Sequence, residues 1–313
     1  MQQQEVGRLV VPVSMLEAID EFIDWRAIKM RGAGKNCDRE LRSLCLFLRN
    51  PEVRVITFTD IMDYLKGLLE VKALHPNSLM NRAISIRKFF EYTRKRGLTT
   101  LDEELIPVPR QQYTIPRVAD DDNYKKLINS IPGKKKDYRT VRNLAILALM
   151  WDTGARSGEI CSLDVADIDI NNKRALIRTE KNRGSRPFRE IFWTEETNKS
   201  VSNWLKAREK FIDKPYFKDC EAMFISIAGT KPFTRITPHG ISNMLSAYCT
   251  RAGIPYINAH SMRHHKAHDI AEKTGSAIDV MNILGHVSIK SSTRYVQMRD
   301  SQLEKRARMI MAR

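Results

Sequence analysis

The chain has 313 residues, 42% of them hydrophobic, and a formal net charge of +16. This length allows two domains with separate cores, and the hydrophobic content excludes a disordered protein. No run approaches the roughly 18 apolar residues of a membrane span, the N-terminus lacks a signal-peptide pattern, and five widely spaced cysteines exclude a disulfide framework and Cys-x-x-Cys zinc sites. We therefore expect a cytoplasmic protein without membrane contacts.

The positive charge is concentrated after residue 112, where 35 lysines and arginines stand against 22 acidic residues. Such a field attracts polyanions, and nucleic acid is the leading candidate, ahead of an anionic membrane surface. Basic charge alone is equally compatible with a solvated lysine-rich face, so the partner must be identified from other features.

Residues 14–97 have apolar side chains three and four positions apart, which predicts four helices. Ser14 is a candidate N-cap of the first helix and Thr59 or Asp60 of the third, while Gly97 ends the fourth. The N-terminal part is therefore predicted to be a small all-helical domain.

The fourth predicted helix carries basic side chains around an apolar stripe of Ile84, Phe89, Phe90 and Tyr92. Its basic face is either the solvated side of a core helix or a surface that contacts DNA backbone. The candidate DNA-binding residues on this helix are Arg82, Arg87, Lys88, Arg94 and Lys95.

Pro107, Pro109 and Pro116 oppose both helix and interior strand, which predicts a linker at residues 107–118. The linker separates an N-terminal domain, residues 1–106, from a C-terminal domain, residues 119–313.

The C-terminal domain alternates between two kinds of periodicity. Strand character in residues 174–193, on both sides of Asn182 to Ser185, predicts a hairpin. The remaining pattern is helical, at residues 120–131, 137–153, 197–211 and 237–252 and from 260 onward. The expected fold class is mainly α with a small antiparallel β-sheet, that is, α+β.

Six residues of this domain are candidates for catalysis at a phosphodiester. A guanidinium grips phosphate oxygens, imidazoles carry protons, and a phenol can attack phosphorus. Each also has an ordinary explanation, such as an ion pair between Arg156 and Glu159, or a half-buried packing role for Tyr295. The six are Arg156 in TGARSGEI, Lys181 in the hairpin, His260 and Arg263 in HSMRH, His286 in Leu-Gly-His, and Tyr295 in STRY.

The order of these six residues resembles the catalytic pattern of the tyrosine recombinases, which include the phage integrases and the Xer and Cre recombinases. That pattern is Arg, Lys, His-x-x-Arg, Leu-Gly-His and Tyr, and several interdependent motifs in order are far more specific than any one. The likeness spans roughly residues 117–313, and the N-terminal helices resemble the DNA-binding core-binding domain of the family. The short chain favours a Xer-like recombinase or a simple mobile-element integrase.

The resemblance implies a site-specific recombinase that cuts and rejoins DNA through a 3′-phosphotyrosyl intermediate, without metal, cofactor or ATP. Tyr295 would be the nucleophile, and Arg156 and Arg263 would stabilise negative charge on the phosphate. His260 would handle the phenolic proton. Lys181 would protonate the leaving 5′ oxygen, and His286 would donate a hydrogen bond to the phosphate.

The family also implies a double-stranded DNA partner with specific recombination sites, and dimers or tetramers assembled on that DNA. Residues 301–313 have apolar side chains at helical spacing, and this tail either docks on its own domain or is exchanged with a neighbouring protomer.

Two features depart from the family pattern. The turn after Lys181 is Asn-Arg-Gly instead of a glycine-flanked lysine, and the nearby Arg183 and Arg186 are further candidates for DNA contact. After HSMRH, His265 and Lys266 replace the usual small residues, and we expect both on the surface.

Three alternatives remain. His260, His264 and His268 would share a helix face and could bind zinc, although the metalloprotease pattern needs Glu where Ser261 stands. A type IB topoisomerase would use the same chemistry to relax supercoils. A non-catalytic DNA-binding protein could reuse the fold, although binding alone does not require Tyr295.

Overall fold

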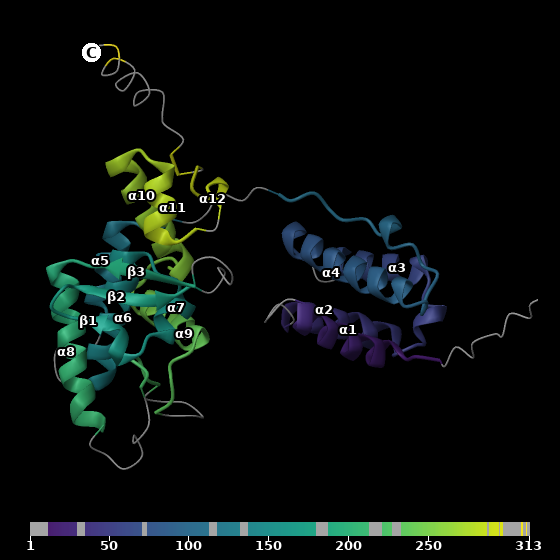
Figure 1. Cartoon of the computed structure of the whole chain (residues 1–313), viewed down its shortest axis with the longest axis horizontal. Coiled ribbons are helices and arrows are strands. Elements are labelled where there is room, and N and C mark those ends of the chain that lie inside the picture. Colours follow the sequence, from purple (N-terminus) through teal and green to yellow (C-terminus); the bar gives the residue numbers. More distant parts are fainter. Residues whose placement is uncertain are drawn as a thin grey trace, which may run out of the picture. The chain divides into compact units, whose positions relative to one another are not determined.

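A computed structural model describes residues 12–29, 35–70, 74–112, 118–131, 137–179, 187–212, 221–226, 233–286, 288–293, 295, 296, 308 and 311. The chain divides into two compact units, residues 1–114 and 115–313 (Figure 1). Each unit is described by itself. Along the described ranges, no helix has the length and apolar character needed to cross a membrane.

In its described residues, the N-terminal unit contains the four α-helices that the periodicity predicted. The third helix begins earlier than expected: the Thr57 hydroxyl caps it by accepting from the Asp60 backbone N–H at 3.3 Å, and the Asp60 carboxylate accepts from the Thr57 backbone N–H at 2.8 Å. Thr59 is therefore not the cap, and Asp60 is the acidic partner in a capping box. The helices are α1 (Met15–Lys29), α2 (Lys35–Leu48), α3 (Phe58–Glu70) and α4 (Pro76–Lys95), with short 3₁₀ turns η1 (Val53–Val55) and η2 (Glu103–Leu105).

Aromatic side chains hold α1 against α4. Phe22 is buried and meets Phe89 edge to face at a ring-centroid distance of 5.7 Å, a favourable geometry for aromatic pairs. Tyr92 lies 5.3 Å from Phe22. The apolar stripe of α4 is thus a packing surface against α1.

The C-terminal unit is mainly helical around a three-stranded antiparallel sheet in the order β1-β2-β3. In β2 the side chains alternate between exposed and buried, and Ala175 pairs with Ile191 and Ile177 with Arg189 of β3. The strands are β1 (Ile168–Asp169), β2 (Arg174–Arg178) and β3 (Phe188–Phe192), and the first helices are α5 (Asp121–Asn129), α6 (Tyr138–Thr153), α7 (Ser157–Ser162), α8 (Glu195–Ile212) and α9 (Pro238–Ala252). The two-residue β1, the six-residue α7 and the 3₁₀ turn η3 (Val165–Asp167) were not predicted because they are too short to show a period.

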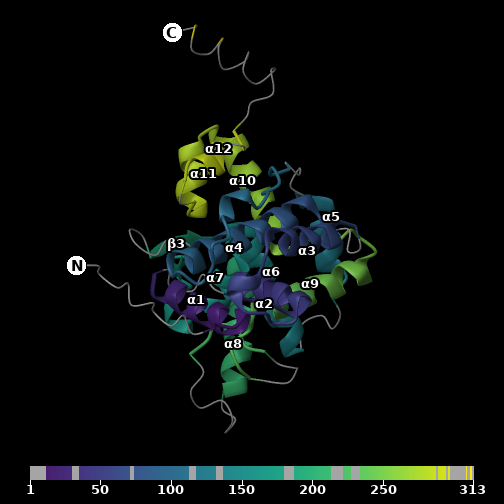
Figure 2. The same ribbon diagram turned by 90° about the vertical axis from the view of Figure 1, so that its right-hand side faces the viewer.

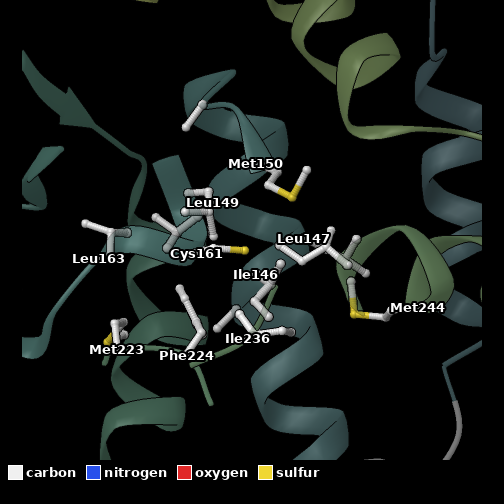
Figure 3. Close-up of a cluster of buried hydrophobic side chains, with 14 of the residues drawn as sticks. Ile146, Leu147, Leu149, Met150, Cys161, Leu163, Met223, Phe224, Ile236 and Met244 are labelled. Atoms are coloured by element: carbon white, nitrogen blue, oxygen red, sulfur yellow. The ribbon is translucent and has the colours of Figure 1, made fainter. Parts of the chain in front are cut away.

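Helix α6 runs through the core of this unit. Ile146, Leu147, Leu149 and Met150 are completely buried, and Figure 3 shows them with Phe224 and other apolar side chains from several elements. The helix ends at Gly154, whose φ of +62° is the left-handed conformation that favours glycine. A Cβ at this position would lie 2.7 Å from Leu284 Cδ2, so both the backbone angle and the close approach require glycine.

The end of the unit forms a second, smaller core. Helices α10 (Ala259–Thr274), α11 (Ala277–Leu284) and α12 (Lys290–Thr293) lie together in Figures 1 and 2. Buried Ala267, Ile270, Ala271, Val280 and Leu284 form this core, and the partly buried Tyr295 and Val296 pack against it. Packing therefore places Tyr295 beside α10, the helix that carries HSMRH.

Candidate active site

Glu159 lies at the centre of a cluster of charges. Its carboxylate is fully buried and pairs with Arg156 Nη1 at 2.8 Å and Arg189 Nη2 at 3.0 Å. It also accepts a hydrogen bond of 2.9 Å from the Arg156 backbone N–H, which orients Arg156 at the start of α7. The structural ion pair considered for Arg156 thus exists, and it fixes this guanidinium in place.

Arg263 joins the cluster from α10. Its guanidinium is buried and donates hydrogen bonds to the carbonyl oxygens of Gly154, at 2.8 Å, and Leu284, at 2.6 Å. Burial lowers its pKa to about 9, with a further contribution from nearby Arg156, and the group remains cationic at neutral pH. Because both of these hydrogen-bond partners are neutral carbonyls, the charge of Arg263 can attract an anion.

Arg189, which has no motif to mark it in the sequence, points into the same cluster from β3. Its Nη1 donates to the Ile283 carbonyl at 2.7 Å, whereas Nε is buried without a hydrogen-bond partner in the described part of the chain. Burial lowers the pKa of Arg189. Arg156 and Arg189 thus pair with the Glu159 carboxylate, and Arg263 lies near them. Within the described residues this cluster carries more positive than negative charge, which suits a phosphate group.

The Leu-Gly-His turn is shaped to admit Arg189. Gly285 has a φ of +65°, and a Cβ there would lie 2.5 Å from Arg189 Cδ and 2.7 Å from its Nε. Glycine thus serves two purposes here, since it ends α11 and leaves space for the arginine.

His286, next in the turn, has a defined ring orientation. Its Nδ1 and the hydroxyl of the fully buried Ser292 are 2.7 Å apart. When Ser292 donates this hydrogen bond, the proton of the neutral imidazole lies on Nε2, which can then donate to a phosphate oxygen. Ser292 has no signal in the sequence that would mark it as a partner of His286.

Tyr295 is surrounded by histidines. Its hydroxyl is hydrogen bonded to Nδ1 of the buried His264. His268 meets the phenol ring edge to face at 5.2 Å, and the His286 ring is stacked at 6.4 Å. His260 is exposed, and its ring lies edge-on to that of His264 at 4.7 Å. His264 and His268 are thus neighbours of the phenol.

His265 and Lys266 were expected on the surface, but each side chain is only 22% exposed, and both line an acidic cavity of about 700 Å³. The His265 ring stacks on Trp151 at 4.1 Å, and Lys266 Nζ lies 3.3 Å from Asp269 and 3.7 Å from Asp152. Within the described ranges, no three His, Cys, Asp or Glu residues are grouped to hold a metal ion.

Three predicted site residues, Lys181, Arg183 and Arg186, lie outside the described residues. The candidates on α4 are described, and most have intramolecular partners. Arg87 donates to the carbonyls of Ile106 and Glu104 at 2.6 and 2.8 Å. The other paired candidates are Arg82 with the Tyr64 hydroxyl at 2.9 Å, Arg94 with both oxygens of Glu103 at 2.6 and 2.7 Å, and Lys95 with Glu91 at 2.5 Å.

Lys88 is exposed on the same helix, beside a groove of about 400 Å³ between α1 and α4. Trp25 and Lys29 also line this groove, with the Lys29 ammonium 4.9 Å from the Trp25 ring centroid. The cations of this groove are suited to phosphate contacts, and the exposed aromatic ring beside them is suited to base stacking.

The sequence profile of the Phage integrase family matches residues 117–302 of the chain. Among curated proteins, the chain is similar to tyrosine recombinase XerC of Corynebacterium efficiens, with 25% identity over 296 residues that cover 92% of this chain and 89% of the relative. XerC of Corynebacterium glutamicum is 23% identical over 227 residues, which are 72% of this chain and 69% of that protein.

Solved structures show the same fold. The integrase of transposon Tn1549, in complex with a circular intermediate DNA, matches with a TM-score of 0.72 at 17% identity over 96% of this chain and 99% of that one. The site-specific recombinase XerH, bound to a palindromic difH substrate, matches with a TM-score of 0.68 at 18% identity, covering 94% and 95% of the two chains.

Proposed function

Because the chain belongs to the Phage integrase family, we propose that it is a site-specific tyrosine recombinase whose nucleophile is Tyr295. The observation that supports this most strongly is the position of the phenol: it packs on the helix that carries Arg263 and is hydrogen bonded to the next residue, His264. A nucleophile and a cationic anion site thus share one helix.

In the cleavage step the Tyr295 oxygen attacks phosphorus, and the bond from phosphorus to the 5′ oxygen breaks. Negative charge builds up on the nonbridging oxygens, where Arg156 and Arg263 stabilise it because their guanidinium groups are already fixed by protein partners. His286 donates a further hydrogen bond through Nε2. In the reverse step a 5′ hydroxyl attacks the phosphotyrosine and restores the phenol.

Two further catalytic assignments follow from the family pattern. Lys181 gives a proton to the leaving 5′ oxygen, and the family pattern assigns the phenolic proton to His260, which is exposed at the start of α10. No step in this sequence of bond changes needs ATP, because the phosphotyrosine keeps the energy of the broken bond.

The partner is double-stranded DNA that carries specific recombination sites, and we place dimers and tetramers of the protein on it. Residues 301–313 then pass to a neighbouring protomer. Their four basic side chains, Lys305, Arg306, Arg308 and Arg313, complement the acidic cavity beside His265. If removal of residues 301–313 leaves cooperative assembly on paired sites unchanged, this exchange does not occur.

The direct test uses a nicked suicide substrate from the protein's own genetic neighbourhood, from which the cleaved fragment diffuses away and traps the covalent adduct. Wild-type protein should form an adduct that resists denaturation, and Tyr295→Phe should form none while it still binds the DNA. A wild type that forms no adduct, or a Phe variant that does, contradicts the proposal.

Relaxation of supercoils, as by a type IB topoisomerase, is the second candidate, because it needs the same phosphotyrosine. A plasmid without recombination sites distinguishes the two functions. A recombinase joins two sites and leaves that plasmid supercoiled, whereas a topoisomerase relaxes it.

A separate prediction about DNA binding compares two cations on α4, the exposed Lys88 and Arg94, which is paired with an acidic residue. Lys88→Gln removes an exposed cation and should lower the slope of log affinity against log salt by about one, the value for one lost phosphate contact. Arg94→Gln should change this slope less, because Arg94 pairs with Glu103, whose carboxyl pKa it lowers. Affinities measured between about 50 and 200 mM salt decide this; equal slope changes would show that both arginine and lysine meet the DNA.

A further inference from the structure

We propose that His264 is the group that takes the phenolic proton of Tyr295 when its oxygen attacks phosphorus. This rests on the proposed function, because it requires Tyr295 to be the nucleophile. The proposal assigns to His264 the proton transfer that the family pattern assigns to His260.

Position and burial both support this role. His264 is only 8% exposed, and its Nδ1 is hydrogen bonded to the Tyr295 hydroxyl, with the two ring centroids 5.6 Å apart. It lies in the second turn of α10, a helix whose start is fixed by reciprocal hydrogen bonds between Asn258 and Ser261. The acceptor is thus in contact with the reacting oxygen before DNA binds, the geometry required of a general base.

The charged and titratable groups around His264 are consistent with a transient imidazolium. The rings of His260 and Tyr295 contact the His264 ring, Arg263 precedes His264 on α10, and His268 and His286 contact the Tyr295 ring. A proton on His264 adds positive charge beside Arg263, which is unfavourable until the phosphorane develops negative charge in the same place. Proton transfer is thereby linked to attack on the phosphate.

Protons and electrons balance over the two half-reactions. His264 begins neutral with its proton on Nε2, and Nδ1 accepts the proton of the phenol as the bond from Tyr295 oxygen to phosphorus forms. The bond from phosphorus to the 5′ oxygen breaks with its electron pair on oxygen, which takes a proton from Lys181. On religation the 5′ hydroxyl gives its proton back to Lys181 as its oxygen bonds to phosphorus. The phosphotyrosine bond breaks with its electron pair on the phenol oxygen, and His264 returns its proton to that oxygen.

Single-turnover cleavage of the suicide substrate tests the proposal. His264→Gln keeps a side chain that can hydrogen bond but cannot accept a proton, and should slow cleavage at pH 7 by at least about 100-fold. His268→Gln is the matched control, since it removes a histidine of the same helix that meets the same phenol through its ring; the change should be less than about threefold. A His264→Gln variant that cleaves within about threefold of wild type overturns the proposal.

A second substrate separates proton acceptance from protonation of the leaving group. With sulfur in place of the bridging 5′ oxygen, the leaving thiolate needs no proton, so Lys181→Ala should regain activity and His264→Gln should not. Rescue of His264→Gln by this substrate would show that His264 protonates the leaving group, and would overturn the proposal.

Wild-type protein provides a measurement that does not depend on how a variant folds. On the sulfur substrate its cleavage rate should fall about tenfold per pH unit at pH values where the accepting histidine is itself protonated. A rate that stays independent of pH down to the acid limit of the folded protein overturns the proposal. If Tyr295→Phe still forms the adduct, the proposed function fails; if Tyr295→Phe is inert and His264→Gln is active, only the role of His264 fails.

Discussion

Replacement of Glu159 by Gln should lower the free energy of unfolding of the C-terminal unit by about 3–5 kcal/mol, the usual cost of removing one partner from a buried ion pair. Glu159 is fully buried, and its partners Arg156 and Arg189 expose only 17% and 9% of their side chains. Water therefore screens these charges weakly. The neutral amide would leave the guanidinium groups of Arg156 and Arg189 without this charged partner.

Urea unfolding followed by tryptophan fluorescence measures this loss, because three of the four tryptophans, Trp151, Trp193 and Trp204, belong to the C-terminal unit. Glu190→Gln is the matched control: this carboxylate pairs with Arg174 at 3.0 Å, but both side chains are more than 40% exposed. We expect a change below about 1 kcal/mol for the control. Equal effects of the two substitutions would show that burial does not strengthen the Glu159 pairs.

Inorganic phosphate should reverse part of the Glu159→Gln defect. With the carboxylate gone, the three cations should bind the added anion more tightly, and binding to the folded state raises stability by mass action. The midpoint of unfolding should therefore rise more steeply with phosphate in Glu159→Gln than in Glu190→Gln. Parallel responses would mean that the cluster is not an anion site.

Gly285→Ala is expected to destabilise the same unit by about 2–5 kcal/mol. About 1–2 kcal/mol comes from a side chain in the left-handed conformation, and about 1–3 kcal/mol from the overlap of the new Cβ with Arg189. Gly253→Ala separates the two contributions, because Gly253 has a φ of +63° and a Cβ added there would meet no described atom within 4 Å. It should show only the conformational part.

A double-mutant cycle with Arg189→Ala completes the test of Gly285. Alanine at 189 removes the atoms that the new Cβ would meet, so Gly285→Ala should cost about as much in that background as Gly253→Ala costs in wild type. The coupling between positions 189 and 285 should exceed about 1 kcal/mol. Strict additivity would show that the turn relaxes without meeting the arginine.

Local sequence pattern was sufficient to predict the helices and the hairpin strands. The periods of 3.6 and 2 report which face of an element is buried, and α2 and α3 each show the helical period clearly over 13 or more residues. The same signal could not resolve η3, β1 or α7, or place the cap of α3 at Thr57, because each depends on only a few residues.

The candidate catalytic residues were proposed from their order in the sequence, but their partners in the structure were not foreseen. Arg189 meets Glu159, 30 residues away, and Ile283, 94 residues away, and neither contact has a local period. His264 lies next to Arg263 in a motif where only the first and fourth residues are marked, and its contact with Tyr295 depends on how the chain returns after α11. Long-range packing decides these contacts, and one sequence does not reveal it.

The two carbonyls that hold Arg263 have a consequence for synthesis of the protein. They belong to Gly154, 109 residues before it, and Leu284, 21 residues after it. When a ribosome has made the chain only as far as α10, the Arg263 guanidinium therefore still lacks its hydrogen-bond acceptor on Leu284. Since contacts distant in sequence form late, the nascent chain should acquire its anion site only after α11 emerges, and a partly made enzyme should not nick DNA.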